Sequence, residues 1–309
     1  MTDFSIVIPV YGNEHNIVAL VARLTELMPE LPESTEVVFV VDGSPDDSYA
    51  VLASILPTAA FRSQLLQHSR NFGSFAAIRT GLGAAHGDAI GVMAADLQEP
   101  AELMVEFQRA LSSGAVDVAV GRRIAREDPA MTSLGSRAFW SLYRRVVIKE
   151  IPPGGVDVFG CTRAVADELV RLDEAHSSLV AQLYWVGFRR AEIPYRRQQR
   201  EHGESGWTLR KRVKYLLDSV FSFTNLPLDL LLLGGLVGTV AVLVIAAVVL
   251  GFYIAGAIHE PGYVPLMLTI LFSTFLTMMS IGIVGAYIWR IFENTKRRPS
   301  SIVMSREEW

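Results

Sequence analysis

Cysteine is almost missing from this chain of 309 residues, which contains only Cys161. A single cysteine cannot form an internal disulfide, so the sequence is typical of a protein that works in a reducing compartment. The ordinary role of such a residue is that of a small buried side chain. The first residues also lack the basic and then apolar pattern of a secretory leader, so we do not expect secretion.

Two common nucleotide-binding motifs are missing as well. No G-x-G-x-x-G follows the first predicted strand, and no P-loop with its Walker lysine is present. These glycine-rich motifs hold the phosphates of dinucleotides and of nucleoside triphosphates against backbone amides. Their absence argues against a dinucleotide-dependent oxidoreductase and against a P-loop NTPase.

Charged residues are scarce between positions 228 and 289, where two long apolar runs follow one another. The run 228–258 carries one charge, Asp229, and the run 263–289 carries none. Each run exceeds the roughly 20 residues that cross about 30 Å of hydrocarbon as a helix. We therefore predict two transmembrane helices, with a buried hairpin of a soluble domain as the alternative.

The positions of Lys and Arg around these runs predict their orientation. The loop 259–262 has neither residue type, whereas basic residues flank the runs on their outer sides: Arg210, Lys211, Arg212, Lys214, Lys296, Arg297 and Arg298. Basic residues stay on the cytoplasmic side of a membrane. We expect a multi-pass protein of the cell (inner) membrane, with the catalytic domain and both termini in the cytoplasm.

Short apolar strands alternate with helices in the N-terminal region. The strands are predicted at 5–10, 36–41, 64–67, 89–94 and 116–120. Near-continuous apolar strands that alternate with helices are typical of a mostly parallel sheet that is covered on both faces. We therefore predict an α/β fold.

Polar residues follow the ends of two of these strands. Asp42 comes directly after the strand 36–41, and Asp96 and Gln98 follow the strand 89–94. The carboxyl ends of parallel strands lie at the sheet edge where ligands bind. A carboxylate and an amide oxygen on one turn can bind a hard divalent cation, which in turn can hold a diphosphate. The alternative is that Asp96 only caps the helix that follows.

Seven segments carry a resemblance to a known family. In chain order they are IPVYGNEHNI, VVDGSPDDS, RNFGSFAAIRTGL, AADLQEP, GGVDVFG, WVGFRRAEIPY and REHGESGW. The first four resemble the family 2 glycosyltransferases with a GT-A fold. The last three and the two-helix tail narrow the resemblance to the polyprenyl-phosphate glycosyltransferases, a group that includes dolichol-phosphate mannose synthases and bacterial enzymes that load undecaprenyl phosphate with a sugar. The resemblance covers nearly the whole chain and implies a Rossmann-like GT-A domain.

On the donor side, the resemblance implies roles for individual residues. The residues placed around the nucleotide's base and ribose are Pro9, Tyr11, Glu14 and Asp42. Asp96, the last acid of the family's D-x-D, would act as a catalytic residue and hold Mg²⁺ or Mn²⁺ together with Gln98 and the donor diphosphate. Two positions depart from the family pattern, because Ala94 replaces the first Asp and Val41 replaces an acid that many members have.

On the acceptor side, the resemblance implies that basic and polar residues bind the lipid phosphate. Arg122 and Arg137 match the family's phosphate-binding arginines, and Arg200 and Ser205 belong to its R-x-x-G-x-S, where Gly206 replaces the usual following Lys. Arginine suits this role because its planar fork forms two parallel bonds to phosphate oxygens. The alternative for Arg122 and Arg137 is a solvated surface charge.

Asp157, which follows a glycine-rich turn, is the candidate for a second catalytic carboxylate. A phosphate monoester is already largely ionised near neutral pH, so the acceptor needs little deprotonation. We therefore expect Asp157 to position the acceptor or the donor sugar.

The chain divides into four predicted parts. A GT-A glycosyltransferase domain spans 1–207, an interfacial amphipathic helix 208–227, a two-helix transmembrane hairpin 228–291 and a cytoplasmic tail 292–309. The amphipathic helix has apolar positions opposite its basic ones, as in helices that lie in a membrane surface, and a core-facing helix is the alternative. A stripe of small residues in the first span is compatible with a homo-oligomer: Gly234, Gly235 and Gly238.

These observations and the resemblance predict the transfer of one sugar from a nucleotide-sugar donor, a UDP-hexose, to polyprenyl (undecaprenyl) phosphate at the cytoplasmic membrane face. The resemblance implies that the transfer is inverting. The expected partners are the nucleotide sugar, the lipid phosphate and the membrane, with no nucleic acid. One alternative is a glycosyltransferase with another lipid or glycan acceptor. The other is a weakly catalytic, membrane-bound scaffold that binds nucleotide sugars.

Overall fold

The computed structural model describes residues 3–125, 140–152, 155–174, 177–197, 209–255, 262–296 and 298–309. The chain forms two compact units. The first combines Met1–Leu216 with Arg298–Trp309, and the second is Leu217–Arg297. The first unit is an α/β unit and the second is helical.

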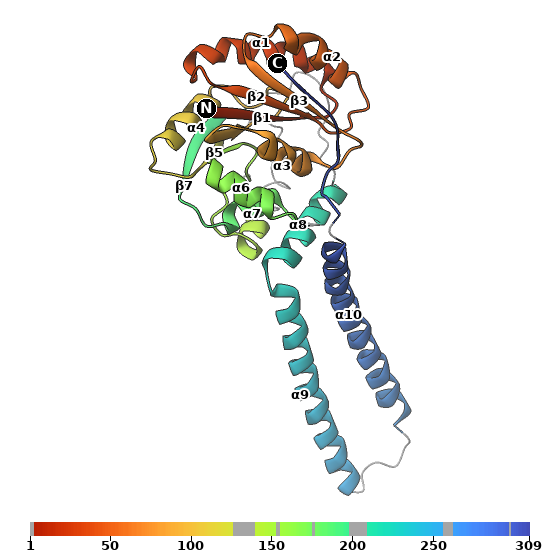
Figure 1. The fold of residues 1–309 in the computed structure, drawn as a ribbon. Helices are drawn as coiled ribbons and strands as arrows, with labels where there is room; N and C mark the ends of the chain where they lie inside the picture. Colours follow the sequence, from red (N-terminus) through yellow and green to blue (C-terminus); the bar gives the residue numbers. More distant parts are fainter. Residues whose placement is uncertain are drawn as a thin grey trace. The chain divides into compact units, whose positions relative to one another are not determined.

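One mixed sheet forms the centre of the α/β unit (Figure 1). Within the described residues, its 8 strands follow the order β7-β5-β6-β4-β1-β2-β3-β8. They are β1 (Phe4–Val10), β2 (Glu36–Val41), β3 (Arg62–His68), β4 (Ala89–Val92), β5 (Val118–Ala125), β6 (Phe159–Thr162), β7 (Arg190–Arg196) and β8 (Val303–Glu308). β1 pairs parallel with β2 and β4, β2 with β3, and β5 with β7, whereas β6 runs antiparallel to β4 and β5, and β8 to β3. The predicted α/β class with a mostly parallel sheet is confirmed.

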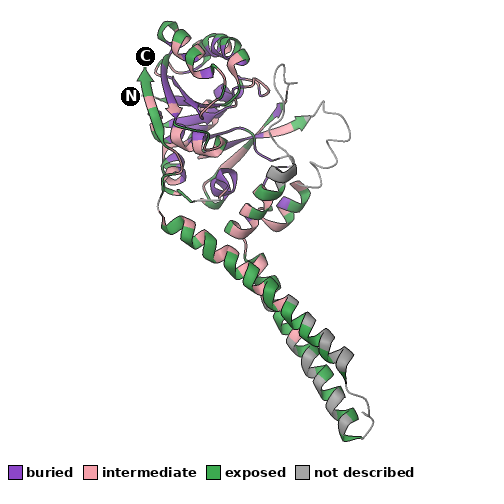
Figure 2. Ribbon diagram, turned by 90° about the vertical axis from the view of Figure 1, so that its right-hand side faces the viewer, coloured by how far each residue is buried: buried purple, intermediate pink, exposed green. Residues whose placement is uncertain are grey.

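Helices cover both faces of this sheet. They are α1 (Glu14–Leu27), α2 (Ser48–Ile55), α3 (Ser74–Ala84), α4 (Leu103–Ser112), α6 (Arg163–Arg171) and α7 (Leu179–Trp185), with short 3-10 turns at Met28–Glu30 and Leu56–Thr58. One apolar core joins α1, α2 and α4 to the sheet, and a second joins α3, α6 and α7 to the opposite face. Ile6 and Ile8 of β1 enter the first core and Val7 enters the second, because successive side chains of a strand point to opposite faces. Figure 2 shows these central strands as buried.

The five strands predicted from the sequence correspond to β1 to β5, with some ends shifted by a few residues. The prediction did not include β6, β7 and β8. β6 has only 4 residues, and β7 and β8 are the two edge strands of the sheet, with several exposed charged side chains. Backbone hydrogen bonds hold an edge strand without an apolar pattern, so the periodicity of the sequence does not reveal it.

β8 brings the residues after the last helix back into the sheet. In the antiparallel pairing, Leu66 of β3 lies opposite Arg306. Trp309 continues the ladder, since its N–H donates to the carbonyl of Ser63 at 3.0 Å and its carbonyl accepts from Ser63 at 2.9 Å. Most of the segment expected to form a cytoplasmic tail therefore belongs to the α/β unit.

The helical unit contains the end of α8 (Leu209–Phe223), α9 (Leu226–Ile254) and α10 (Tyr263–Thr295). Within it, Arg290 of α10 lies 2.8 Å from the carboxylate of Asp218 in α8. In the described part of the chain, Phe272–Thr295 is long and apolar enough to cross a membrane, and none of its most apolar window is buried. A further candidate is a helix pair, Val213–Phe223 with Leu226–Gly238, bent by 83°. The structure thus offers one candidate span by length and composition, and the two-span hairpin stays a prediction.

The first turns of α8 pack on the α/β unit through Tyr215. Its ring stacks on Tyr143, with 5.5 Å between the ring centroids, and its hydroxyl lies 2.8 Å from the hydroxyl of Ser178. The predicted apolar positions of α8 are more open, since Val213 is 48% exposed and Leu217 is 50% exposed. The turn around Tyr215 therefore faces the core, as the alternative prediction for this helix expected. The interfacial role of the exposed apolar positions stays a prediction.

Candidate active site

The loops after β1, β2 and β4 meet at one edge of the sheet. The parallel registers place Val10 opposite Val41 and Val7 opposite Val92, so these strands end close together. Because β1 lies between β2 and β4, the loops that begin with Asp42 and Asp96 are separated by about 10 Å of sheet width. This edge holds the predicted donor residues.

Asp46 locks the loops after β1 and β2 together. Its carboxylate accepts hydrogen bonds from the hydroxyls of Ser44 and Ser48, at 2.5 and 2.6 Å, and from the backbone N–H of Glu14 at 3.1 Å. Burial acts to raise the pKa of Asp46, but the hydrogen bonds from Ser44, Ser48 and Glu14 outweigh it, so the pKa lies below its ordinary value. The ionised carboxylate is therefore a structural part of this edge.

The predicted nucleotide residues on the β1 side lie around this junction. Pro9 is partly buried in β1, and Tyr11 is 51% exposed in the loop that follows. Glu14 begins α1 and accepts a hydrogen bond from the N–H of Asp47 at 2.9 Å. Tyr11 thus presents an open aromatic ring at the edge, and Glu14 links the two loops.

Asp42 is buried at the end of β2, where its carboxylate accepts three hydrogen bonds. Oδ1 lies 2.8 Å from Nδ1 of His68 and accepts from the N–H of Phe72 at 2.8 Å, while Oδ2 accepts from the N–H of Gly73 at 2.7 Å. Burial acts to raise the pKa of Asp42, but the bonds from His68, Phe72 and Gly73 bring it below its ordinary value. The chain itself surrounds this carboxylate, and its contact with a ribose stays a prediction.

Asp96 and Gln98 lie on a tight turn after β4. Leu97 between them has a φ of 54°, a left-handed conformation that is costly for a residue with a branched side chain. The N–H of Gln98 donates to the carboxylate of Asp96 at 3.3 Å. α4 begins later, at Leu103, with Glu102 at its N-cap, so Asp96 does not cap that helix.

Sheet topology brings further charged residues to this turn. β6 runs antiparallel to β4, with Val92 opposite Phe159, so Asp157 just before β6 lies where β4 ends. β7 runs parallel to β5, with Arg123 opposite Tyr195, so both strands end at the same edge. These strands surround the Asp96 turn with side chains that are distant in the sequence.

These side chains form a charged cluster of Gln98, Glu99, Arg123, Asp157, Tyr195 and Arg197. Arg197 donates to Oε1 of Gln98 at 2.5 Å and its Nε lies 3.4 Å from Glu99. Arg123 forms an ion pair with Asp157, whose carboxylate also accepts from the hydroxyl of Tyr195 at 3.2 Å. Burial raises the pKa of Glu99, and although Arg197 and Arg123 act in the opposite direction, the pKa stays above its ordinary value.

Arg122 points away from this cluster. Neighbouring residues of a strand face opposite sides, so the side chains of Arg122 and Arg123 diverge. Nε of Arg122 lies 3.0 Å from Glu192, and both side chains are more than 40% exposed, at 42% and 45%. The structure thus leaves Arg122 at the surface, where the predicted phosphate contact remains open to it, and buries Arg123 to 6% exposure.

Three predicted acceptor residues, Arg137, Arg200 and Ser205, lie outside the described residues. Next to the first of them, Trp140 packs its ring against Tyr143, with 5.4 Å between the centroids. A Cβ on Gly155, whose φ is 82°, would overlap the Trp140 ring, so the ring can lie there only because residue 155 is a glycine.

Glu99, Arg123, Tyr195 and Arg197 are site residues that sequence reasoning missed. Glu99 and Tyr195 lie within the quoted segments AADLQEP and WVGFRRAEIPY, Arg197 follows the second segment, and Arg123 is the neighbour of Arg122. Position along the chain does not say which of two adjacent strand residues faces the ligand edge. The alternation of β5 and its pairing with β7 supply that information.

The donor set at the Asp96 turn fits a magnesium-like ion. The described residues contain no group of three or more His, Cys, Asp or Glu side chains placed to hold a metal. Mg²⁺ is commonly bound by one or two carboxylates plus water and substrate phosphates, so Asp96 and the amide oxygen of Gln98 suffice. Because that amide oxygen accepts from Arg197, the guanidinium and a cation would share one ligand.

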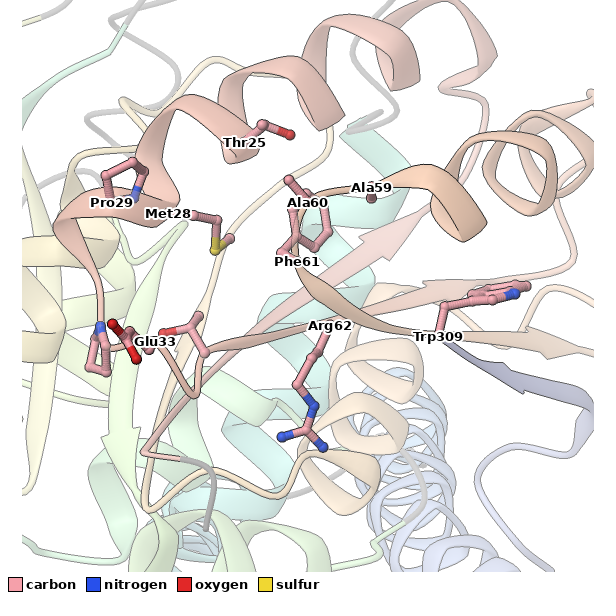
Figure 3. A pocket seen from close by; sticks show the side chains of 11 residues that line it. Thr25, Met28, Pro29, Glu33, Ala59, Ala60, Phe61, Arg62 and Trp309 are labelled. Atoms are coloured by element: carbon pink, nitrogen blue, oxygen red, sulfur yellow. The ribbon is translucent and has the colours of Figure 1, made fainter.

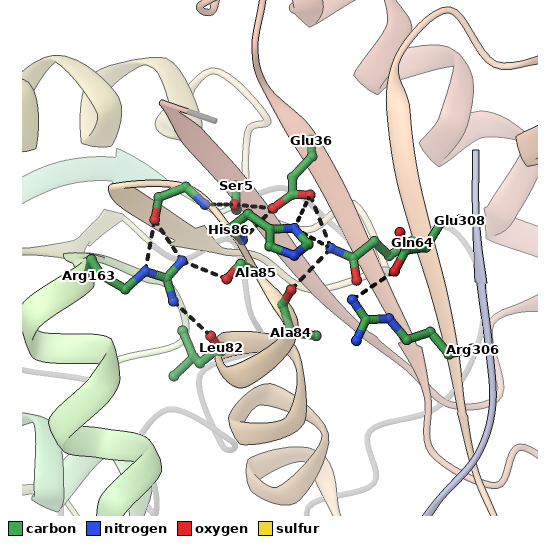
Figure 4. Close-up of polar contacts among 11 residues, drawn as sticks. Ser5, Glu36, Gln64, Leu82, Ala84, Ala85, His86, Arg163, Arg306 and Glu308 are labelled. Carbon is green, nitrogen blue, oxygen red and sulfur yellow. Dashed lines mark hydrogen bonds and ion pairs between the residues drawn. The ribbon is translucent and has the colours of Figure 1, made fainter. Parts of the chain in front are cut away.

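The opposite edge of the sheet has different features. A hollow of about 590 Å³ lies at the amino ends of β2 and β3 and is lined by residues that include Met28, Phe61, Arg62 and Trp309 (Figure 3). Nearby, the buried carboxylate of Glu36 accepts from Ser5 at 2.7 Å and from the N–H of His86 at 2.6 Å (Figure 4). Ligands of open α/β sheets bind at the carboxyl edge, so the amino edge is not part of the candidate site.

Comparison with known proteins defines the class of this chain. The profile of glycosyl transferase family 2 matches residues 5–172. The chain is 31% identical to an uncharacterised glycosyltransferase of Synechocystis sp. over 301 residues, which cover 97% of this chain and 94% of the relative. This chain therefore belongs to glycosyltransferase family 2, and it is a glycosyltransferase.

Two further proteins are similar to this chain. The bactoprenol glucosyl transferase of Shigella phage SfV is 27% identical over 305 residues, which cover 98% of this chain and 99% of the relative. The solved glucosyl-3-phosphoglycerate synthase of Mycobacterium tuberculosis, in complex with Mn²⁺, UDP-glucose and phosphoglyceric acid, has a TM-score of 0.50 and 15% identity, and covers 71% of this chain and 77% of that one. At this identity the second likeness shows the GT-A-like fold alone.

Proposed function

We propose that this chain transfers a single hexose from a UDP-hexose donor to a polyprenyl phosphate at a membrane surface. The observation that carries the proposal is the sheet edge where Asp96 and Gln98 lie beside Arg123 and Arg197. A carboxylate and an amide suit a cation-held diphosphate, and arginines suit phosphate oxygens. The name of the phage relative supports a bactoprenol acceptor.

The acceptor phosphate is the nucleophile in this reaction. One of its oxygens forms a bond to the anomeric carbon while the bond from that carbon to the donor diphosphate breaks, and the nucleoside diphosphate leaves. Attack from the opposite side inverts the anomeric carbon. A phosphate that is already ionised gives up no proton in this step, so the site needs no strong base. Asp157, held by Arg123 and Tyr195, has the fixed geometry of a positioning group.

Charge stabilisation is the main task of the chain's own residues. A divalent ion, when held by Asp96 and Gln98, would neutralise the leaving diphosphate. Arg122 at the exposed end of β5, with Arg137, Arg200 and Ser205, would bind the lipid phosphate. In the free protein, the positive charges of Arg123 and Arg197 offset the carboxylates of Asp157 and Glu99 near the Asp96 turn.

The helical unit supports a location at a membrane. Phe272–Thr295 exposes apolar side chains such as Met278, Ile288 and Ile291, which are 61%, 61% and 62% exposed. A continuous apolar surface of this kind is unfavourable in water and favourable in hydrocarbon. We propose that α9 and α10 form a two-span hairpin of the cell membrane, with the α/β unit on the cytoplasmic side.

The experiment that tests this function is release of nucleoside diphosphate by the detergent-purified protein. A panel of UDP- and GDP-sugars is supplied with and without undecaprenyl phosphate, and with Mg²⁺, Mn²⁺ or chelator. Release that requires one donor, the lipid phosphate and a divalent ion is the expected result and identifies the sugar. Release without the lipid phosphate would indicate another acceptor. Nucleotide binding without any release would favour the non-catalytic scaffold.

A further inference from the structure

A series of hydrogen bonds runs from the C-terminal segment to the donor edge, by which we mean the edge of the sheet that holds the predicted donor residues. The hydroxyl of Ser301 lies 2.7 Å from the hydroxyl of Thr80 in α3, and the Thr80 oxygen lies 2.9 Å from Nε2 of His68. Nδ1 of the same imidazole lies 2.8 Å from the carboxylate of Asp42. The side chains of Thr80 and His68 therefore connect Ser301, close to β8, with Asp42 of the proposed nucleotide site.

Donors and acceptors match at each link of this series. The carboxylate of Asp42 only accepts, so Nδ1 of His68 carries a proton. In the neutral imidazole Nε2 then accepts from the hydroxyl of Thr80, whose oxygen accepts from Ser301. His68 is fully buried and the Asp42 side chain is 3% exposed, so water does not compete for these bonds.

Asp42 in turn holds the loop 69–73 in place through hydrogen bonds. Its two oxygens accept from the N–H groups of Phe72 and Gly73, at 2.8 and 2.7 Å. A carboxylate has about four acceptor positions, so with His68 included about one position, on Oδ2, remains for a ligand. Gly43 after β2 allows the close approach of this loop, since a Cβ there would lie 2.2 Å from the backbone carbon of Arg70.

We propose that His68, Thr80 and Ser301 are positioning residues of the donor site. They fix the rotation of Asp42, and through it the loop 69–73, so that the free acceptor position and the loop backbone meet a nucleoside diphosphate in one geometry. The segment after α10 thereby becomes part of the donor site. This inference rests on the proposed function, because it assigns the donor edge to a nucleotide.

The test uses substitutions in the full-length protein that change one link at a time. Thr80→Val removes the hydroxyl and keeps the branched shape, whereas Thr80→Ser keeps the hydroxyl. Ser301→Ala removes the hydroxyl at the far end of this series of hydrogen bonds. Ser305→Ala is the matched control, because Ser305 lies in β8 and its hydroxyl contacts Tyr49 at 3.1 Å and Gln67 at 3.3 Å, outside the chain of bonds.

Two measurements are made on each variant. The first is the dissociation constant for UDP and for GDP with Mg²⁺, by calorimetry in detergent. The second is hydrogen exchange of the backbone amides of Phe72 and Gly73 in the absence of nucleotide. The second readout reports the position of the loop directly and does not depend on which nucleotide the protein binds.

The expected result separates the variants into two groups. Thr80→Val and Ser301→Ala raise the dissociation constant about three- to tenfold, the range of one lost hydrogen bond, and speed amide exchange by a similar factor. Thr80→Ser and Ser305→Ala stay within about twofold of wild type. The melting temperatures of all four variants serve to show that the fold is intact.

Unchanged nucleotide affinity and unchanged exchange in Thr80→Val would overturn the proposal. An equal loss in Ser305→Ala would also overturn it, because docking of the segment as a whole, and not the chain of hydroxyls, would then set the site. Wild-type protein that binds neither UDP nor GDP would overturn the donor role together with the proposed function. The two failures are distinguishable, since the first leaves wild-type binding intact.

Discussion

At the scale of single residues, the carboxylates of the donor edge fall into two kinds. Asp42 and Asp46 are satisfied by hydrogen bonds from the chain, which lower their pKa values against the effect of burial. Glu99 has a raised pKa, because burial outweighs the neighbouring arginines. The first kind holds loops in place, whereas Asp96 lies on a strained turn, beside Leu97 with its left-handed backbone, and its ligand role is a proposal.

Asp96→Asn is expected to lower metal-dependent release of nucleoside diphosphate by about 100-fold or more, since it removes the charge that a cation and diphosphate require. The free energy of unfolding should change little, because the amide keeps the shape of the side chain. The control Glu102→Gln alters a surface carboxylate that pairs with Arg23 and should retain full activity. Equal activity of Asp96→Asn and wild type would remove Asp96 from the metal site.

Arg122 and Arg123 provide a matched pair for separating binding from stability. Arg122→Ala should raise the KM for lipid phosphate and change the free energy of unfolding by less than about 0.5 kcal/mol, because its ion pair with Glu192 is exposed. Arg123→Ala leaves the carboxylate of Asp157 without its ion-pair partner and should lower the free energy of unfolding by about 1 to 3 kcal/mol. Denaturant titration and steady-state kinetics measure both. A larger effect of Arg122→Ala on the donor KM would place it on the nucleotide side.

At the scale of elements, loops and edge strands decide what the site can do. The loops after β1 and β2 depend on ionised Asp46, and the loop 69–73 depends on Asp42. At the far edge, β8 holds its place through backbone pairing with β3. Each of these contacts joins segments that are far apart in the chain.

Acid should destabilise the α/β unit through buried carboxylates at both edges of the sheet. The pKa values of Glu36, Asp42 and Asp46 are lower in the folded chain than the ordinary value near 4. Their ionised forms therefore stabilise the fold above about pH 4, and this stabilisation is lost as the pH falls through the folded pKa values. Denaturant titrations between about pH 6 and pH 2 should show a falling free energy of unfolding. Asp46→Asn should make that fall shallower, and an unchanged slope would contradict this role.

The pairing of β8 can be tested with one position and two substitutions. Trp309 and Ser63 exchange both backbone hydrogen bonds, so by alternation Glu307 donates its N–H to the ladder as well. Glu307→Pro removes that donor, whereas Glu307→Ala removes only the side chain and its bond to Tyr49. The proline variant should be less stable than the alanine variant by about 1 to 3 kcal/mol in denaturant titrations. Equal stability would mean that β8 adds nothing to the fold.

At the scale of the whole molecule, two units with different surfaces are joined in one chain. The α/β unit has the two buried cores of a soluble domain, while Phe272–Thr295 in the helical unit has an unburied apolar window. Under the proposed function, the polar site lies on the α/β unit and the helical unit provides membrane attachment. This division is suited to a reaction between a soluble donor and a lipid acceptor.

Thiol labelling can test the proposed topology without a cysteine-free background. Cys161 is fully buried and burial raises its pKa to about 12, so the wild type should react poorly with maleimides. In spheroplasts, a membrane-impermeant maleimide should label His259→Cys in the predicted outer loop. It should label Glu30→Cys, on the α/β unit, only after permeabilisation. Labelling of both in intact spheroplasts would contradict a cytoplasmic catalytic unit.

The class of the fold, the strands β1 to β5, the resemblance to the family and the two apolar runs could all be predicted from the sequence alone. These follow from patterns among neighbours in the chain, such as the apolar run before Asp42 or the turn residues around Asp96, which remain visible without any tertiary contact. The edge strands β7 and β8 and the short strand β6 were not predicted, since backbone pairing needs no distinctive side chains.

Only the tertiary structure decided which side chains meet at the site. Arg197 reaches Gln98 across 99 residues of sequence, and His68 with Thr80 and Ser301 reaches Asp42 through contacts that no local motif records. The choice between Arg122 and Arg123 likewise depends on which face of β5 turns toward the Asp96 turn. The physical reason is that strand register and sheet order set these distances, and both are fixed by the packing of the two cores rather than by the spacing of residues along the chain.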